Sequence, residues 1–227
     1  MLFRSRHLFS NNDISLSWNH FLDNLKQGTP FYLILCILLM PINWAIESRK
    51  WQLLVLPFEQ ITFITSVKAI FSGISVALLT PNRIGEYGGR MVVVKAKNNW
   101  KAVISTLISS YSQNIWNIGL GLLGAMIFLH NTQMIKSYLY LSGVSISILF
   151  FVLIIFLYYH IDLINRLLNK WHQFRIVSKA LVHLKLLKKY KTKTLSSVLL
   201  LALFRYIVYL FQYFLILKFF GLEVGVV

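Results

Sequence analysis

Apolar residues in this chain are grouped into long runs that are separated by short polar segments. A helix needs about 20 apolar residues to cross a bilayer, and most of the runs approach or exceed that length. We expect membrane-spanning helices at about residues 31–46, 61–79, 100–129, 138–159 and 195–219. The pattern therefore predicts an all-α, polytopic transmembrane helical bundle that forms a single membrane domain over residues 1–227.

Residues 81–97 interrupt this pattern. Pro81 disfavours the helical conformation at Thr80, so the preceding helix should end there. The stretch that follows, residues 84–96, is about 20 Å long as a helix and too short to span comfortably. We predict a half-helix here, and two arrangements remain open: a re-entrant hairpin with 61–79, or a full span at 61–79 followed by an interfacial helix.

Basic residues are concentrated in two segments. Nine of the 23 lysines and arginines lie between Asp162 and Thr194, directly between two apolar runs. This is the positive-inside pattern, which predicts that loop 160–194 is cytoplasmic and that the basic segment from Arg83 to Lys101 lies on the same side. Membrane topology thus explains the net charge of +16, and we expect no nucleic-acid partner.

The composition agrees with a membrane protein and does not favour catalysis. Hydrophobic residues make up 57% of the chain and charged residues 13%, where a soluble domain holds about a quarter charged residues. Cys36, the only cysteine, excludes an intrachain disulfide and is expected to pack in an apolar interior. The six histidines lack metal-ligand spacing, and the seven acidic residues form no close pair, so neither a metal nor a cofactor is implied.

The charged, glycine-rich break at residues 80–90 is the first candidate functional segment. Arg83, Glu86 and Arg90 are spaced i, i+3 and i+7, which places them on one face of a helix. If Pro81 opens that helix, the amides from Asn82 onward form a helix start that attracts a phosphate, and arginines grip phosphate bidentately.

The glycines of this segment leave room for close approach by another helix or a lipid headgroup; they are Gly85, Gly88 and Gly89. A simpler alternative is that the charges only reach to the membrane interface, with Glu86 bridging two arginines and the glycines permitting tight packing. Lys68, in the preceding apolar run, is similarly ambiguous because its flexible stem can reach an interface.

Arg205 lies near the middle of the last apolar run, where an arginine is costly unless it has a partner or a wet cavity. Glu86 is the expected counter-ion, because Glu47, Glu59 and Glu223 are placed near helix ends. We therefore include Arg205 in the candidate site.

The segment LTPNRIGE at 79–86, followed by Gly89 and Arg90, resembles the signature of the lysylphosphatidylglycerol synthase transmembrane region. The resemblance extends from about residue 30 onward. It implies a multi-pass bacterial inner-membrane protein related to the flippase half of the multiple peptide resistance factor, whose members move or handle phospholipid or polyprenyl-phosphate lipids.

The same resemblance limits what can be carried over. The chain has no soluble aminoacyl-transferase domain, so lysyl transfer is not implied. Family members usually have another helix before the first span and a second glycine-rich motif in their later half. We therefore expect this chain to be a fragment that is incomplete at both ends.

Our leading hypothesis is a flippase-like protein that binds or translocates a phospholipid or polyprenyl-phosphate lipid, with membrane lipids as its partners. The alternatives are an accessory membrane subunit of lipid-linked sugar or cell-envelope lipid synthesis, without catalysis in this chain, and a membrane scaffold. The expected headgroup-binding or translocation-path residues are Pro81, Asn82, Arg83, Gly85, Glu86, Gly89, Arg90 and Arg205.

Overall fold

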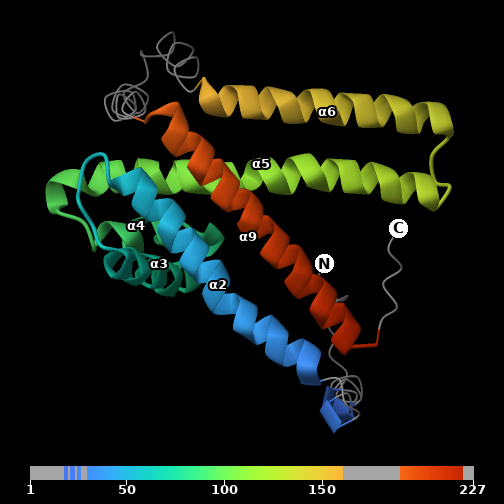
Figure 1. Ribbon diagram of the computed structural model, residues 1–227, viewed down its shortest axis with the longest axis horizontal. Coiled ribbons are helices and arrows are strands. Elements are labelled where there is room, and N and C mark those ends of the chain that lie inside the picture. The colour runs from blue at the N-terminus through green and yellow to red at the C-terminus, as the bar shows by residue number, and fades with distance from the viewer. Residues whose placement is uncertain (1–17, 20, 24, 27–29, 161–189, 222–227) are drawn as a thin grey trace. The chain divides into compact units, whose positions relative to one another are not determined.

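The computed structural model describes residues 18–19, 21–23, 25–26, 30–160 and 190–221, and the regular structure in these residues is entirely helical (Figure 1). The predicted all-α class is confirmed. Most of the basic loop predicted at 160–194 falls outside the described residues, since these omit 161–189. The elements, in which η marks a short 3-10 turn, are α2 (Pro30–Val55), α3 (Phe63–Leu78), η1 (Pro81–Arg83), α4 (Gly85–Met91), η2 (Ala96–Asn98), α5 (Asn99–Asn131), α6 (Ser137–Tyr159) and α9 (Thr192–Phe219).

Four helices of the described chain are long and apolar enough to cross a membrane: α2, α5 together with η2, α6 and α9. α2 is longer than predicted. The sequence interpretation ended this span at residue 46, before the first charged side chains, whereas the helix continues to Val55. Those charges are paired within the fold, which lowers the cost of placing them in a span.

α3 has 16 residues and is about 24 Å long, less than the four candidate spans. Thr62 caps its start by accepting a hydrogen bond from the N–H of Thr65 at 3.1 Å. At its other end, the N–H of Gly85 donates to Thr80 Oγ1 at 2.8 Å, which fixes the turn into α4. The half-helix predicted at 81–97 therefore takes the form of η1, α4 and η2.

α3 and α4 form a tightly packed helical hairpin. A Cβ atom added to Gly85 would lie 2.5 Å from the carbonyl oxygen of Val76, and one added to Gly89 would lie 2.5 Å from that of Ser72. The Ser72 hydroxyl donates to the Gly89 carbonyl at 2.9 Å. Gly88, between them, faces open space. Two of the three glycines are thus required for the close approach of these helices.

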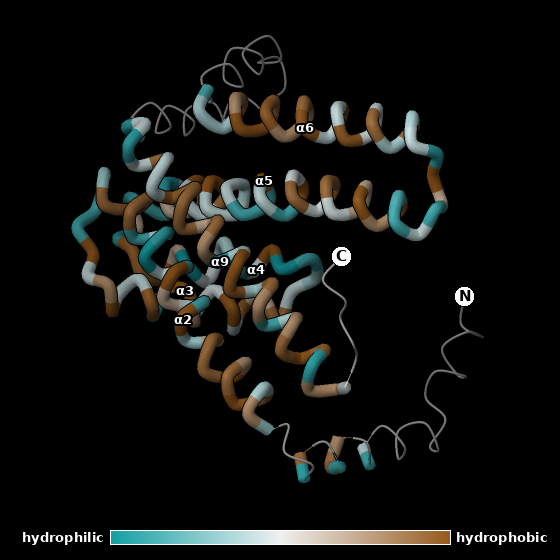
Figure 2. Tube along the Cα trace, turned by 45° about the vertical axis from the view of Figure 1, so that its right-hand side comes forward, coloured by the Kyte–Doolittle hydropathy of each residue, from teal (hydrophilic) through white to brown (hydrophobic). Residues whose placement is uncertain are grey.

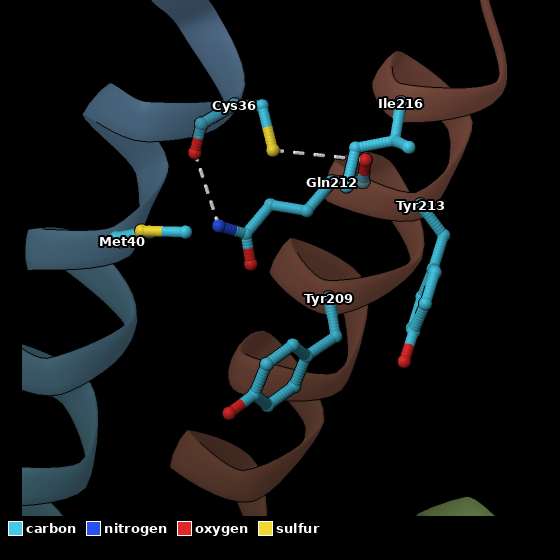
Figure 3. Close-up of a pocket in the computed structure, with 6 residues that line it drawn as sticks. All are labelled: Cys36, Met40, Tyr209, Gln212, Tyr213 and Ile216. Atoms are coloured by element: carbon cyan, nitrogen blue, oxygen red, sulfur yellow. Dashed lines mark hydrogen bonds between the residues drawn. The ribbon is translucent and has the colours of Figure 1, made fainter. Parts of the chain in front are cut away.

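The chain divides into two compact units, residues 1–43 with 207–227 and residues 44–206. In the first unit, the early part of α2 and the late part of α9 are joined through Gln212. Its Nε2 donates to the carbonyl of Cys36 at 3.1 Å, and a cavity of about 190 Å³ lies beside this contact (Figure 3). Cys36 is 3% exposed, in agreement with its predicted packing role. The cavity is lined by Cys36, Met40, Tyr209, Gln212, Tyr213 and Ile216.

In the second unit, α5 and α6 lie side by side (Figure 1). Gly119 faces the ring of Phe151, and Gly143 faces the sulfur of Met126, so each helix offers a glycine to a large side chain of the other. Strongly hydrophilic residues of α6 gather at its ends (Figure 2), and only Ser147 and Tyr158 of this helix are buried. Such an apolar, exposed surface is typical of contact with lipid.

Hydrogen bonds connect α9 to α5 and α6, and connect a residue just before α9 to α2. Trp116 Nε1 donates to the carbonyl of Leu199 at 2.9 Å, and the Tyr158 hydroxyl donates to that of Leu195 at 3.1 Å. Tyr190, just before α9, donates to the carbonyl of Leu54 at 2.8 Å. These bonds hold the start of α9 next to the end of α2, so the residues adjoining the basic loop lie close to that end.

Replacing Gly89 with alanine should destabilise the protein. The added methyl group would meet the α3 backbone, and over-packing of this kind costs about 1–3 kcal/mol. The matched control is Gly88→Ala, because Gly88 lies on the same short helix and faces open space. Thermal unfolding in detergent should show a lower midpoint for Gly89→Ala only. Equal midpoints for the two variants would contradict the packing described here.

Candidate functional site

The carboxylate of Glu47 is the centre of a buried ion cluster in residues 44–206. Its Oε2 atom lies 2.8 Å from Lys50 Nζ and 2.6 Å from Arg205 Nη1. Its Oε1 atom lies 3.0 Å from Arg90 Nη2 and accepts a hydrogen bond from the Ser109 hydroxyl at 3.2 Å. The four partners come from α2, α9, α4 and α5, so one side chain joins four helices.

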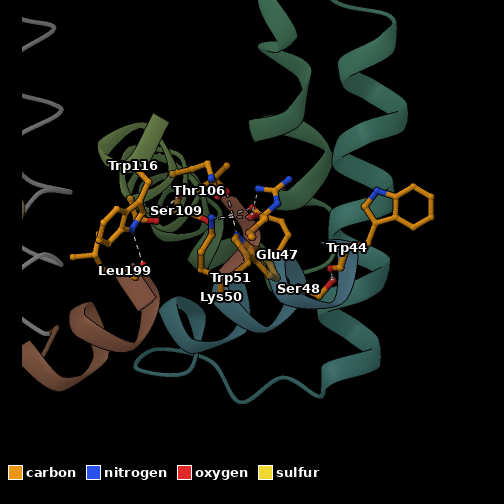
Figure 4. Close-up of polar contacts among 12 residues, drawn as sticks. Trp44, Glu47, Ser48, Lys50, Trp51, Thr106, Ser109, Trp116 and Leu199 are labelled. Carbon is orange, nitrogen blue, oxygen red and sulfur yellow. Dashed lines mark hydrogen bonds and ion pairs between the residues drawn. The ribbon is translucent and has the colours of Figure 1, made fainter. Parts of the chain in front are cut away.

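The cluster is almost completely removed from the surface. Glu47 is 4% exposed, Arg90 2%, and Lys50 and Ser109 0%, while the Arg205 side chain is 18% exposed. In Figure 4, Lys50 and Ser109 point toward Glu47, whereas Trp44 points away from it. Glu47 is eight residues, or about 12 Å, before the end of α2. The cluster therefore lies within this helix and not at its end.

Local sequence explains why α2 and α5 present these groups to each other. Glu47, Lys50 and Trp51 lie within one turn of α2, so they share a face. Trp51 is fully buried and donates through Nε1 to the Thr106 hydroxyl at 3.1 Å. A polar face of α5 is buried against this side of α2; its members Ser105, Ser109, Ser112 and Gln113 are at most 8% exposed.

Glu86 connects the cluster to the tip of the α3–α4 hairpin. It forms an ion pair with Arg90, one turn later on α4, and its Oε2 atom lies 3.5 Å from Arg83 Nη2. The Arg83 side chain is 71% exposed and that of Glu86 18%. The three residues predicted on one face therefore form a continuous chain of charges, with Glu86 between the two arginines, that runs from an exposed to a buried position.

The helix start differs from the expected one. Asn82 and Arg83 have φ angles of 53° and 58°, in the left-handed region, and Pro81–Arg83 forms a 3-10 turn. α4 begins at Gly85, and the N–H of that residue is already bonded to Thr80. The amides after Pro81 therefore do not form the anion-binding α-helix start that the sequence suggested, because the chain turns before it becomes α-helical.

The remaining candidates are distributed as follows. Pro81 and Asn82 are exposed at the hairpin turn, Gly85 and Gly89 are used for packing against α3, and Lys68 is exposed on α3. The structure brings Arg90, Glu86 and Arg205 together, but through a residue that was not a candidate. Within the described part of the chain, no group of three or more His, Cys, Asp or Glu residues could hold a metal ion.

Glu47 is the central residue of the cluster, and the sequence interpretation missed it. We expected Glu86 to neutralise Arg205, whereas the structure pairs Arg205 with Glu47 at 2.6 Å. Glu47 was dismissed because the first span was ended one residue before it. The i, i+3 spacing of Glu47 and Lys50 was the available signal, since it is typical of an ion pair inside a helix.

Positive charge exceeds negative charge in this cluster. Leaving aside Arg83, whose side chain is 71% exposed, Glu47 and Glu86 contribute two negative charges and Lys50, Arg90 and Arg205 contribute three positive charges, which leaves a net charge of +1. Arg90 also retains two buried donors, Nε and Nη1, that have no hydrogen-bond partner. Lys50 Nζ forms its ion pair with Glu47 but makes no aligned hydrogen bond. Unused donors beside excess positive charge favour a bound anion.

The pairing of Arg205 with Glu47 predicts a specific double-mutant result. Glu47→Gln should be strongly destabilising, because removing one partner of a buried ion pair costs about 3–5 kcal/mol. Adding Arg205→Gln should recover part of that loss, since one of the unpaired cations disappears with it. Thermal unfolding of the two single variants and the double variant measures this coupling.

The control cycle combines Glu86→Gln with Arg205→Gln, because Glu86 pairs with Arg90 whereas Arg205 pairs with Glu47. Their coupling should be smaller than that of Glu47 with Arg205, since it acts only through other members of the cluster. If the coupling is larger for Glu86 than for Glu47, the assignment of Glu47 as the counter-ion of Arg205 is wrong.

Comparison with known proteins agrees with this architecture. The family model described as "Lysylphosphatidylglycerol synthase TM region" matches residues 14–227, which is nearly the whole chain. No curated protein and no solved structure matches significantly. The family match and the four long apolar helices together identify a multi-pass membrane protein. The chain belongs to the lysylphosphatidylglycerol synthase transmembrane-region family, which links it to membrane-lipid synthesis or flipping.

Proposed function

We propose that this protein binds a lipid through its phosphate group and moves the headgroup across the bilayer. The lipid is a phospholipid or a polyprenyl phosphate. The observation that carries the proposal is Arg90, which is 2% exposed and has two donors without partners inside a cluster of net charge +1. A phosphate would accept from one of these donors, which lie on different edges of the guanidinium, and would neutralise the excess charge.

The chain of charges from Arg83 to Glu47 supports a path as well as a binding site. Arg83 is exposed at the hairpin turn and can meet a headgroup first. Glu86 and Arg90 then lead to the buried cluster around Glu47. Charged groups inside a membrane domain are costly and typically mark a substrate pathway, which favours this function over a purely structural role.

The proposed orientation follows from the ends of the helices. Tyr190, in the described end of the predicted 160–194 loop, bonds both the Leu54 carbonyl and the Ser105 hydroxyl, so this residue lies at the end of α2 and the start of α5. The basic residues Lys95, Lys97 and Lys101 lie at that same start. We propose that this side faces the cytoplasm of a bacterial cell and that the protein resides in the inner membrane.

The conservative substitution Arg90→Lys tests the phosphate site most directly. Lysine keeps the positive charge that Glu47 and Glu86 require, but it lacks the further fixed donors that Nε and Nη1 provide. We expect the variant to remain folded and to retain about tenfold less phosphatidylglycerol, as measured by mass spectrometry of lipid bound to the purified full-length protein.

Lys68→Arg is the matched control, because Lys68 is an exposed cation on α3 outside the cluster. Transfer of fluorescent phosphatidylglycerol in proteoliposomes should fall in Arg90→Lys and stay unchanged in Lys68→Arg. Wild-type protein that neither retains an anionic lipid nor accelerates its transfer would overturn the proposed function and favour a scaffold role.

A further inference from the structure

A polar line on α5 continues from the ion cluster and is not used by it. Ser109 bonds Glu47, and Gln113, Asn117, Gly121 and Gly124 follow at intervals of three or four residues. Residues with this spacing lie on one helix face. We call the last four residues the α5 track.

Gln113 begins the track with an unsatisfied polar group. It is 8% exposed, and its Oε1 atom has no hydrogen-bond partner. Its Nε2 atom donates to Asn117 Oδ1 at 3.5 Å, which shows that the amide is directed along the track. An unpaired amide at this depth is unfavourable unless a ligand or another polar group completes it.

The rest of the track is open. Asn117 is exposed only two residues beyond the midpoint of the 33-residue helix α5. Positions 121 and 124 have nothing within 4 Å of an added Cβ atom. Glycine at both positions therefore leaves free space directly beyond two amide groups, whereas Gly119 on another face of the same helix is filled by Phe151.

We propose that the α5 track binds the hydroxyl or amine groups of the lipid headgroup while the phosphate occupies or leaves the Arg90 site. This inference rests on the proposed function. Ser109 and Gln113 are one helical turn apart, about 6 Å, which matches the size of a small headgroup attached to a phosphate. Amides provide both donors and acceptors, so glycerol, sugar and amine headgroups all fit, and headgroups without such groups are disfavoured.

The inference makes the track a specificity determinant. A site built to hydrogen-bond a hydroxyl or amine rejects an analogue that lacks it, because the buried polar group of the site then stays unpaired. The suitable pair of probes is phosphatidylglycerol and phosphatidylmethanol. Both carry one negative charge, and only the first has headgroup hydroxyls. Phosphatidylethanolamine tests an amine in place of the hydroxyls.

The experiment measures transfer of these lipids, with fluorescent acyl chains, in proteoliposomes that contain the full-length protein. Wild type should move phosphatidylglycerol about tenfold faster than phosphatidylmethanol, the effect of one or two buried hydrogen bonds. Gln113→Leu should lower the transfer rate of phosphatidylglycerol to that of phosphatidylmethanol, and the rate of phosphatidylmethanol should not change. Asn117→Leu, at an exposed position, should act in the same direction and provides a second variant if Gln113→Leu folds poorly.

Gly121→Leu should slow all the lipids equally by filling the track. Gly88→Leu is the control, because Gly88 also faces open space but lies on the side of α4 opposite Glu86 and Arg90. Equal wild-type rates for the two anionic lipids, or a preference that survives in both Gln113→Leu and Asn117→Leu, would overturn this inference and leave the proposed function standing. Absence of any transfer or retention by wild type would instead overturn both.

Discussion

The arrangement of residues 44–206 depends on one carboxylate, that of Glu47. Three cations and a hydroxyl from four helices converge on it. In a bilayer the apolar surfaces of helices gain little by leaving lipid, so polar contacts and close packing must specify which helices associate. Separating α4 or α9 from α2 would break an ion pair in an apolar environment, which costs several kcal/mol, and separating α5 would remove the hydrogen bond from Ser109. The cluster therefore fixes the positions of the helix segments that it joins.

A cluster whose charges were fully neutralised would hold the helices together more strongly, yet this cluster carries one more positive than negative charge. A structural network would gain from satisfying the two unused donors of Arg90. Under the proposed function this imbalance is explained, because a lipid phosphate supplies the missing negative charge and accepts from one of those donors. Stability of the empty protein is then reduced in favour of ligand binding, as is common where polar groups are held ready for a substrate.

Periodicity was sufficient to locate the later helices. The predicted spans 100–129, 138–159 and 195–219 differ from α5, α6 and α9 by at most three residues at either end. The first span was misjudged because its charges are tolerable only when paired, and the pairing of Glu47 with Arg205 joins positions 158 residues apart. No local pattern contains that information. The same limit applies to the glycines, since Gly88 and Gly89 are adjacent in sequence but only Gly89 contacts α3.

The rigidity of the cluster also bears on how a headgroup would move. A mechanism in which α2, α4, α5 and α9 shift against one another would have to break the ion pairs of Glu47 in every cycle. Movement of the headgroup along a fixed polar surface avoids that cost. The α5 track offers such a surface, because it starts one turn from Ser109 and opens where Gly121 and Gly124 remove side chains. Under the proposed function, the ion pairs of Glu47 and the open face of α5 together favour transfer along α5 over transfer by separation of the helices.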